Sequence, residues 1–450
     1  MKTLLFLFSI FITFISVSVF AADKAKIDDF LSGKSDFGAI ESMAKAEGQV
    51  NWYYWGGSEE LNLWVDMTVA PELAKKGIKL NPVRIKDTQE AIDIVISEEI
   101  AGKGLGQGSA DLIWVNGDKF LSLVKAQALL GPFADKLPNS RFYSFDPATP
   151  DGALNLFDFG QPTDKAEMPW SGEQYVCYAD TARIKKNEIP TDFKGLAAYL
   201  KKNPGKFTYI APPNYNGVTF VESAIRSLAP AELMQNFSKA PASKDNANGL
   251  TPDTIEKMFR PGFEYLKSLE PYLTGGGKTK RGNPVYPTDQ KVLQSMFKSG
   301  EINMACEFGI YNVAVKINAG EFNKSVEPVL FPKKGMIKNR NFLVIPFNSP
   351  NPAAAMVLID LLSSPEMQIS KLKEIGFPAA VSADKMSAAQ RQALDKAAPV
   401  QALSAVDMEK EAAPEFNSAL VPIVRDLWEE FIRKNSDKKF GEVFRQVVKN

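Results

Sequence analysis

Between residues 48 and 67 the hydrophobic positions change from a continuous run to a helical repeat, which predicts a strand followed by a helix. Residues 50–55 are β-branched and aromatic, a composition typical of a buried strand. The pair of glycines that ends at Gly57 allows a sharp turn, because glycine has no Cβ. Ser58 can cap the next helix, in which apolar residues recur at helical spacing from Leu61 onward. We therefore expect this stretch to be the first half of a βαβ unit.

The same order of elements continues along the chain. Residues 78–85 and 111–115 are expected to be buried strands, and residues 88–100 and 119–128 are expected to be helices. Strands that alternate with helices at this spacing are typical of a mainly parallel sheet with helices on its faces. The pattern therefore predicts the α/β fold class.

A stretch rich in proline, aspartate and asparagine at 133–170 interrupts this pattern, which then resumes. The expected strands and extended segments of the second half lie at 169–180, 206–210, 301–309, 325–332 and 341–347, and the expected helices at 191–203, 218–228, 255–269, 288–299, 352–363, 420–432 and 440–448. With 450 residues, the chain is long enough for two or three domains.

The turns at the carboxyl ends of the expected strands form the candidate binding site. In open α/β sheets, ligands bind in the crevice beyond these strand ends. The turns after the first and third strands should lie side by side, and both carry aromatic and neutral polar residues. Later segments add further aromatic residues, amides and one carboxylate. The candidate ligand-binding residues are Trp55, Gly57, Ser58, Asn62, Trp114, Asn116, Gly117, Trp170, Gln174, Tyr175, Asn214, Tyr215 and Glu307.

The absence of histidine from the sequence limits the chemistry that the chain can perform. It removes the commonest general base and the commonest metal ligand, together with Ser–His and Cys–His triads. The two cysteines, Cys177 and Cys306, are too few for a four-cysteine metal site. They could form one disulfide in an oxidising compartment, or they could be two buried thiols. No cofactor, metal site or catalytic residue is expected.

The charge of the chain gives no attraction for nucleic acid, because 53 basic and 53 acidic residues balance to zero. The amino-terminal residues instead indicate export. Lys2 precedes an apolar run at 3–20, and the residues up to Ala21 fit the positions that a signal peptidase reads. We expect residues 1–21 to be a cleaved signal peptide. The alternative is an uncleaved membrane anchor, since the run is almost long enough to span a bilayer.

Short motifs distributed along the chain carry a family resemblance. They are WYYWGG at 52–57, AGKG at 101–104, DLIWVNGDKF at 111–120, LLGPFADKLPN at 129–139, PWSGEQ at 169–174, FKSGEINMACEF at 297–308 and SSPEMQ at 363–368. Together they resemble the substrate-binding proteins of ABC importers, in the type II periplasmic group, and several fit its YnjB-type branch. The resemblance covers nearly the whole chain after the expected signal peptide.

The resemblance implies a two-lobed fold, with a mainly parallel sheet in each lobe and a hinge that the chain crosses twice. Lobe 1 would hold residues 22–170 and 333–399, and lobe 2 would hold residues 171–332. Residues 400–450 would form helices that pack across the lobes. Hinge closure would enclose a ligand between the lobes, for delivery to the transmembrane subunits of an ABC permease. Such a protein would be a monomer without enzymatic activity, in the periplasm of a Gram-negative bacterium.

The family resemblance does not define the ligand, since relatives carry polyamines, thiamine, ferric iron, sugars and anions. The aromatic residues at the strand ends favour cations and rings. Glu59, Glu60 and Glu173 add negative charge, whereas no arginine occurs in the strand-end turns. We therefore expect an organic cation or a neutral metabolite. The alternative function is a secreted hydrolase such as a glycosidase, with Asp158 and Glu173 as its carboxylate pair.

Overall fold

The computed structural model describes residues 23–244, 246–276 and 284–449, so the expected signal peptide at 1–21 lies outside the described residues. Eight strands form one sheet in the order β2-β1-β3-β9-β6-β7, with β10 beside β9 and β8 beside β6. These strands are β1 (Gln49–Trp55), β2 (Lys79–Ile85), β3 (Leu112–Val115), β6 (Glu167–Asp180), β7 (Met304–Phe308), β8 (Val326–Val329), β9 (Met336–Val344) and β10 (Ala412–Pro414). A separate pair consists of β4 (Phe157–Asp158) and β5 (Gln161–Pro162).

The α/β class is confirmed, but the sheet is mixed rather than mainly parallel. β2, β1 and β3 are parallel neighbours, as the βαβ pattern predicts. In contrast, β9 runs antiparallel to both β3 and β6, and β6 runs antiparallel to β7 and β8. The spacing of strands and helices predicts connections between neighbours in sequence. That spacing does not predict the position of β9, which follows β3 by more than two hundred residues in sequence but lies beside it in the sheet.

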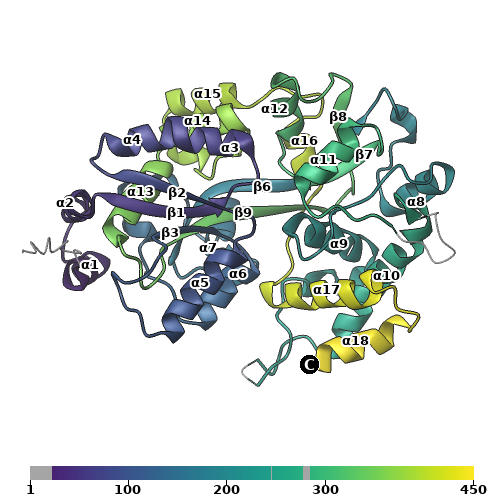
Figure 1. Ribbon diagram of the computed structural model, residues 1–450, viewed down its shortest axis with the longest axis horizontal. Coiled ribbons are helices and arrows are strands. Elements are labelled where there is room, and N and C mark those ends of the chain that lie inside the picture. Colours follow the sequence, from purple (N-terminus) through teal and green to yellow (C-terminus); the bar gives the residue numbers. More distant parts are fainter. Residues whose placement is uncertain (1–22, 245, 277–283, 450) are drawn as a thin grey trace, which may run out of the picture.

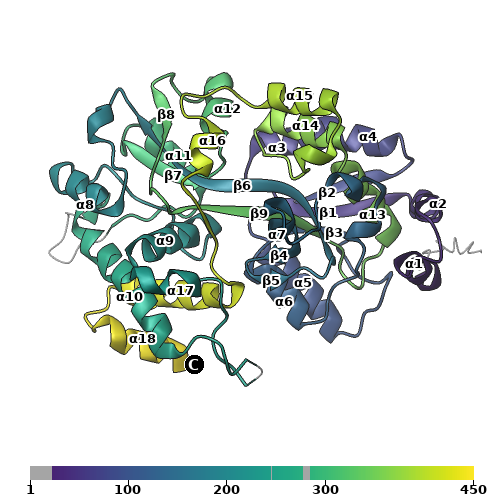
Figure 2. The same ribbon diagram turned by 180° about the vertical axis from the view of Figure 1, so that it is seen from behind.

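The long strands β6 and β9 run through the middle of the molecule (Figures 1 and 2). Residues 167–174 of β6 pair with β9, whereas residues 175–180 pair with β7 and β8. β9 pairs with β10 near its start and with β3 near its end. These two strands therefore continue the sheet from one end of the molecule to the other.

The helices form two groups, one toward each end of β6 and β9 (Figure 1). The first group consists of α1 (Lys24–Leu31), α2 (Phe37–Glu47), α3 (Glu59–Trp64), α4 (Ala70–Ala74), α5 (Gln89–Ile100), α6 (Asp118–Lys125), α7 (Pro150–Leu156), α13 (Pro352–Leu362), α14 (Pro365–Ile375) and α15 (Ala388–Ala397). The second group consists of α8 (Phe193–Lys202), α9 (Tyr215–Leu228), α10 (Pro252–Leu269), α11 (Gln290–Lys298), α12 (Asn312–Asn318), α16 (Ala405–Glu409), α17 (Val421–Leu427) and α18 (Phe440–Lys449). We call the first group with β1, β2 and β3 the first side, and the second group with β7, β8 and β10 the second side.

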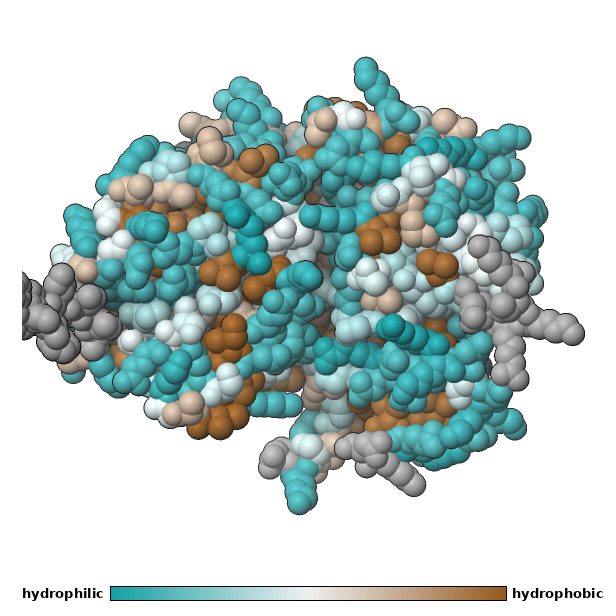
Figure 3. Space-filling model, in the orientation of Figure 1, coloured by the Kyte–Doolittle hydropathy of each residue, from teal (hydrophilic) through white to brown (hydrophobic). Residues whose placement is uncertain are grey.

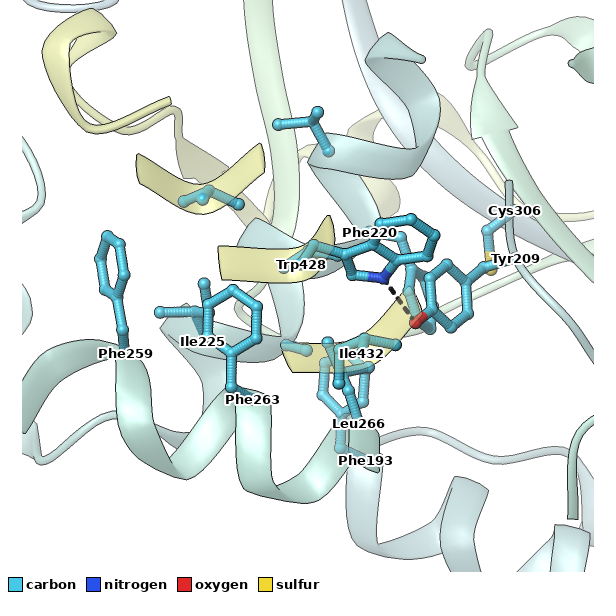
Figure 4. Close-up of a cluster of buried hydrophobic side chains, with 14 of the residues drawn as sticks. Phe193, Tyr209, Phe220, Ile225, Phe259, Phe263, Leu266, Cys306, Trp428 and Ile432 are labelled. Carbon is cyan, nitrogen blue, oxygen red and sulfur yellow. Dashed lines mark hydrogen bonds between the residues drawn. The ribbon is translucent and has the colours of Figure 1, made fainter. Parts of the chain in front are cut away.

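Each side buries its own set of hydrophobic side chains. On the first side, Trp52 is fully buried in a cluster that α2 and α13 cover. On the second side, Phe220 of α9 and Trp428 belong to a large cluster with α10 (Figure 4). The indole nitrogen of Trp428 donates a hydrogen bond to the Tyr209 hydroxyl at 3.0 Å, so its polar atom is satisfied inside this core.

The C-terminal helices pack mainly on the second side. Leu427 at the end of α17 and Phe440 at the start of α18 are both buried in the second cluster. Contact with the first side includes an ion pair between Arg425 Nη1 and Asp118 Oδ2, at 2.7 Å. The apolar faces of these helices thus lie on the second side, and Arg425 extends their contact to the first side.

The two cysteines form a disulfide. Cys177 on β6 and Cys306 on β7 face each other in the antiparallel register, and their Cα atoms are 4.0 Å apart. The alternative of two buried thiols is therefore wrong. The bond fastens β6 to β7 just beyond the part of β6 that pairs with β9.

The segment 206–210 was expected to be a strand, and this prediction is wrong. Its apolar side chains are buried, but the segment belongs to none of the described sheets. Its backbone carbonyls accept hydrogen bonds from the N–H groups of Asn303 and Thr274, which lie on separate loops. A run of buried apolar residues therefore formed extended chain without a partner strand.

The surface shown in Figure 3 is mainly hydrophilic, with apolar residues in separate small patches. Among the described residues, no helix has the length and hydrophobicity needed to cross a membrane. The large apolar side chains are concentrated in the buried clusters of the two sides.

Candidate functional site

A cavity of about 470 Å³ lies between the first side and the second side. The turns after β1, β2 and β3 and the end of α14 form its wall on the first side. The start of α9, one face of α11 and the segment from the end of β7 into α12 form its wall on the second side. β6 and β9 contribute Glu173, Asn339 and Asn341, which we call the floor. A cavity of this volume can enclose a small metabolite.

Seven of the thirteen candidate ligand-binding residues line this cavity, and six do not. The lining candidates are Trp55, Gly57, Ser58, Trp114, Asn116, Asn214 and Tyr215. The candidates outside the lining are Asn62, Gly117, Trp170, Gln174, Tyr175 and Glu307. Most candidates from the turns after strands therefore line the cavity, whereas the three candidates within β6 do not.

The turn after β1 is shaped by close contacts between its own residues. A Cβ on Gly57 would lie 2.1 Å from the Trp55 ring, so glycine is needed for Trp55 to lie over this turn. Ser58 Oγ accepts a hydrogen bond from Leu61 N at 3.1 Å and begins α3, as the sequence predicts. Asn62 supports the turn from behind, because its side-chain amide donates to the Gly56 carbonyl at 3.0 Å.

Aromatic rings form one continuous wall on the first side. Trp114 makes edge-to-face contacts with Trp55 and Phe377, with ring centroids 6.5 Å and 6.1 Å apart. Trp170 lies behind Trp114 at 5.2 Å and is fully buried in the core. Trp55 and Trp114 therefore face the cavity, whereas Trp170 supports them.

The wall of the second side begins with α9. Asn214 caps this helix, and the ring of Tyr215 stacks on Phe308 with centroids 4.9 Å apart. The Tyr215 hydroxyl donates to Glu415 Oε1 at 2.5 Å. It also accepts a hydrogen bond of 3.4 Å from the amide of Asn116, which belongs to the first side. This contact joins the two walls of the cavity.

The floor depends on the alternation of side chains along β6 and β9. Glu173 is paired with Asn339 in the antiparallel register, so these two side chains share a face. Gln174 is the next residue and points to the other face, where its amide donates to the Met408 carbonyl at 2.8 Å. Its neighbour Glu173 was not among the candidates, yet it lines the cavity.

Tyr175 shares the face of Glu173 but is separated from the cavity. Its ring is covered by Phe308, with centroids 5.3 Å apart. Its hydroxyl donates to the Cys306 carbonyl at 3.2 Å. The Tyr175 hydroxyl therefore has its hydrogen-bond partner on β7 and does not face the cavity.

Gly117 and Glu307 act from behind the lining. Gly117 has φ +63° and its N–H donates to Asp158 Oδ2 at 2.7 Å, which fixes the turn after β3. Glu307 accepts hydrogen bonds from Gln294 at 2.9 Å and Asn312 at 2.6 Å, and both of these amides line the cavity. Burial raises the pKa of Glu307 to about 7, although the hydrogen bond from Gln294 and the charge of Lys316 oppose the shift.

Charged groups line the cavity in balance, with six cationic and six acidic side chains. Two ion pairs join the sides: Glu60 with Lys316 at 3.5 Å, and Asp118 with Arg425 at 2.7 Å. Burial alone would raise the pKa of Glu60, but a hydrogen bond from Ser58 and the charge of Lys316 lower it overall. Arg425 was not expected at the cavity, because it belongs to α17 and not to a strand-end turn.

The carboxylates proposed for a hydrolase do not share the cavity. Glu173 lines it, whereas Asp158 is 1% exposed and lies outside the lining, bonded to Gly117. Burial raises the pKa of each carboxyl to about 8. Within the described ranges, no group of three or more His, Cys, Asp or Glu side chains could hold a metal ion.

Several lining residues were missed, and only some of them had a signal in the sequence. Phe308 precedes a glycine at the end of a strand, as Trp55 does, and this repeated pattern could have identified it. Phe377 follows the glycine that ends α14. Asn339 and Asn341 occupy alternate positions of β9, but their relevance depends on β9 lying beside β6.

A sheet shared by two sides, with a cavity built from strand-end turns between them, defines the class of type II periplasmic binding proteins. Maltose-bound MalE3 of T. maritima has a TM-score of 0.62 and 14% identity, over 89% of this chain and 98% of that one. A putative spermidine/putrescine ABC transporter from Listeria monocytogenes has a TM-score of 0.54 and 12% identity, over 89% of this chain and 99% of that one. These likenesses confirm the expected type II periplasmic-binding-protein fold class, whereas the division into two lobes stays a prediction.

The sequence comparisons define the family. Residues 69–395 match the family described as bacterial extracellular solute-binding protein. Protein YnjB of Escherichia coli (strain K12) is 31% identical over 368 residues, which are 81% of this chain and 87% of that protein. The chain belongs to the bacterial extracellular solute-binding protein family, as the motifs in its sequence indicated.

Proposed function

We propose that this protein is the solute-binding component of an ABC importer, which captures a small molecule in the cavity and delivers it to a membrane permease. The observation that carries the proposal is that both sides and the two strands joining them contribute to one cavity. A ligand held there contacts both walls and so favours their approach. Membership of the solute-binding family supports this reading.

The lobes of the proposed binding protein are residues 22–170 with 333–399, and residues 171–332. The separate hydrophobic clusters of the two sides support this division. β6 and β9 form the proposed hinge, since their residues pair with strands of both sides. Residues 400–450 add helices to lobe 2 and reach lobe 1 through Arg425.

The proposed location is the periplasm of a Gram-negative bacterium, after removal of residues 1–21. The family assignment and the disulfide between Cys177 and Cys306 support an oxidising compartment outside the cytoplasm. The proposed partners are the transmembrane subunits of an ABC permease and a small-molecule ligand, with the binding protein as a monomer. Binding and release would need no covalent chemistry, so we propose no enzymatic activity.

The proposed ligand is an organic cation or a neutral metabolite. The aromatic wall of Trp55, Trp114 and Phe377 supports a ligand with a flat or cationic group. The helix that begins at Ser58 carries Glu59 and Glu60 in its first turn, which disfavours an oxyanion there.

A thermal-shift screen of the purified protein against a metabolite library tests the function. A ligand at 100 times its Kd should stabilise the protein by about 2.7 kcal/mol. Small-angle scattering with the best compound should then show a smaller radius of gyration. Absence of both effects across the library, or turnover of a chromogenic glycoside, would contradict the proposal.

A further inference from the structure

Glu173 differs from the other carboxylates that line the cavity. It is 6% exposed, and within the described residues neither of its oxygens has a well-formed hydrogen bond, although the backbone N–H groups of Ile310 and Gln174 are near enough to lower its pKa. Glu60 and Asp118, in contrast, are paired with Lys316 and Arg425. A buried acceptor without a donor costs free energy. The position of Glu173 on the cavity floor therefore indicates that a ligand supplies the donor.

Protein cations near Glu173 are engaged elsewhere. Lys371 is buried and attracts Glu173, but its Nζ donates to the Trp170 carbonyl and, at 3.2 Å, to Gln368 Oε1. Tyr311 is the other titratable group that interacts with Glu173. Burial raises the pKa of Glu173 to about 8, although the backbone N–H of Ile310 and the charge of Lys371 oppose the shift. Among the residues that the structure describes, the carboxyl thus has no counter-ion in direct contact.

The surroundings of Glu173 combine polar acceptors with apolar rings. Asn339 Oδ1 on the paired strand is also buried, and it has no hydrogen-bond partner in the described part of the chain. Phe377 is held next to this part of β6, because the Gly172 N–H donates to the Pro378 carbonyl at 3.3 Å. A ligand that complements this region would place N–H donors against Glu173 and Asn339, and an apolar group against Phe377.

We propose that Glu173 binds a protonated amine of the ligand, with Asn339 as a second acceptor and the rings of Trp114 and Phe377 against the adjoining apolar part. This inference rests on the proposed function and narrows its ligand class. Quaternary cations lack the N–H donor, and neutral hydroxyl compounds lack the charge. Hydrogen bonds between an ammonium group and a carboxylate are stronger than neutral ones.

Binding of an amine changes the protonation of this site. The carboxyl is mainly neutral in the empty cavity at pH 7, because its pKa is about 8. An ammonium ion favours the carboxylate, so the proton leaves to solvent and a charge-assisted hydrogen bond forms. Release of about one proton per ligand is therefore expected at pH 7. The Glu173 charge raises the pKa of Lys371 and of Tyr311, so the comparison of wild type with a Glu173 variant reports the proton change of these three side chains together.

Calorimetry at pH 7 tests the inference with tyramine, putrescine and spermidine as probes. Buffers of different ionisation enthalpy report the protons released. At least one amine should bind wild type, and Glu173→Gln should weaken it at least tenfold and abolish proton release. Tyrosol, in which a hydroxyl replaces the amine of tyramine, should bind at least tenfold more weakly than tyramine if tyramine is the bound probe.

Glu222→Gln is the matched control. Glu222 is 1% exposed, has a pKa raised to about 8 by burial and has an unpartnered oxygen, but it lies outside the cavity lining. Its replacement should change amine affinity by less than threefold, and thermal melts should show that both variants fold.

Three outcomes overturn the inference: no amine binds, Glu173→Gln binds the amine as wild type does, or tyrosol matches bound tyramine. If maltose or another neutral compound of the library binds and compacts the protein instead, the proposed function stands and the role of Glu173 is rejected. If nothing in the library binds, the proposed function fails as well.

Discussion

Trp114 is the residue at which the cavity wall and the first core meet. Its ring contacts Trp170 inside the core at 5.2 Å and Trp55 at the cavity at 6.5 Å. Trp170 is fully buried, so it holds Trp114 in a fixed orientation. A residue placed in this way contributes to folding and to recognition at once.

Replacing Trp114 by alanine should therefore weaken both properties. The free energy of unfolding should fall by about 2 kcal/mol, less than for a fully buried tryptophan, because the ring has one face at the cavity. The affinity of a bound probe should fall about tenfold. Urea denaturation and calorimetry measure the two effects. Trp55→Ala is the control and should lower stability less, and equal losses in the two variants would contradict this account.

At the scale of elements, β1, β2 and β3 were predictable because their signals are local. β1 and β3 are short and mainly apolar, β2 has apolar residues at alternate or nearby positions, and each strand is followed by residues that favour a turn. The cavity wall made of Trp55, Ser58 and Trp114 followed from those signals. Most candidate residues of these turns therefore line the cavity, and their role in ligand binding stays a prediction.

β6 was harder to interpret because all fourteen of its residues are buried. A strand buried on both faces shows no alternation of polar and apolar positions, so its sequence does not say which residues share a face. The sequence therefore did not show that Glu173 lines the cavity whereas Gln174 and Tyr175, which were both candidates, do not. Asn339 was missed because its position depends on pairing between β6 and β9, which no local pattern encodes.

The disulfide gives a prediction for β6 and β7. It joins residues separated by 129 positions, so it restricts a large loop of the unfolded chain. Replacing Cys177 and Cys306 together by alanine should lower the free energy of unfolding by about 2–4 kcal/mol. Urea denaturation measures this loss, and wild type in reducing agent should show a similar one. An unchanged denaturation midpoint in both cases would contradict a stabilising role.

At the scale of the whole molecule, the two ion pairs between the sides favour the arrangement seen here. Lys316 is 8% exposed and Arg425 24% exposed at the side chain, so solvent screens these pairs less than it screens a surface pair.

Replacing Lys316 and Arg425 together by alanine should increase the radius of gyration of the ligand-free protein, because the sides lose two contacts. Small-angle scattering checks this outcome. Lys186→Ala is a control, since Lys186 pairs with Glu327 within the second side at 2.8 Å. An unchanged scattering profile of the double variant would show that other contacts hold the sides together.

Buried carboxyls give the whole molecule a specific dependence on pH. Burial raises the pKa values of Glu47 and Glu307 to about 7, and those of Asp158, Glu173 and Glu222 to about 8. Such groups bind protons more tightly in the folded state than in the unfolded state. Their stabilising contribution is therefore complete below their unfolded pKa values and is lost as pH rises through 7 and 8.

The free energy of unfolding should consequently decrease from pH 5 to pH 8. Urea denaturation across this range measures the slope. Glu222→Gln removes one of the titrating groups and should make the decrease shallower. A stability maximum at pH 8 in wild type would contradict the prediction.

The position of β9 between β3 and β6 has a consequence for how the chain reaches this structure. β3 ends at Val115, and its outer edge has no partner until synthesis has proceeded as far as Val344. An unpaired strand edge can template pairing with other chains, and closing so long a loop slows completion of a sheet. During biosynthesis the amino-terminal third is therefore an unfinished sheet that is prone to aggregation. The arrival of β9 ends that exposure and, in the same step, sets Asn339 and Asn341 into the floor of the cavity.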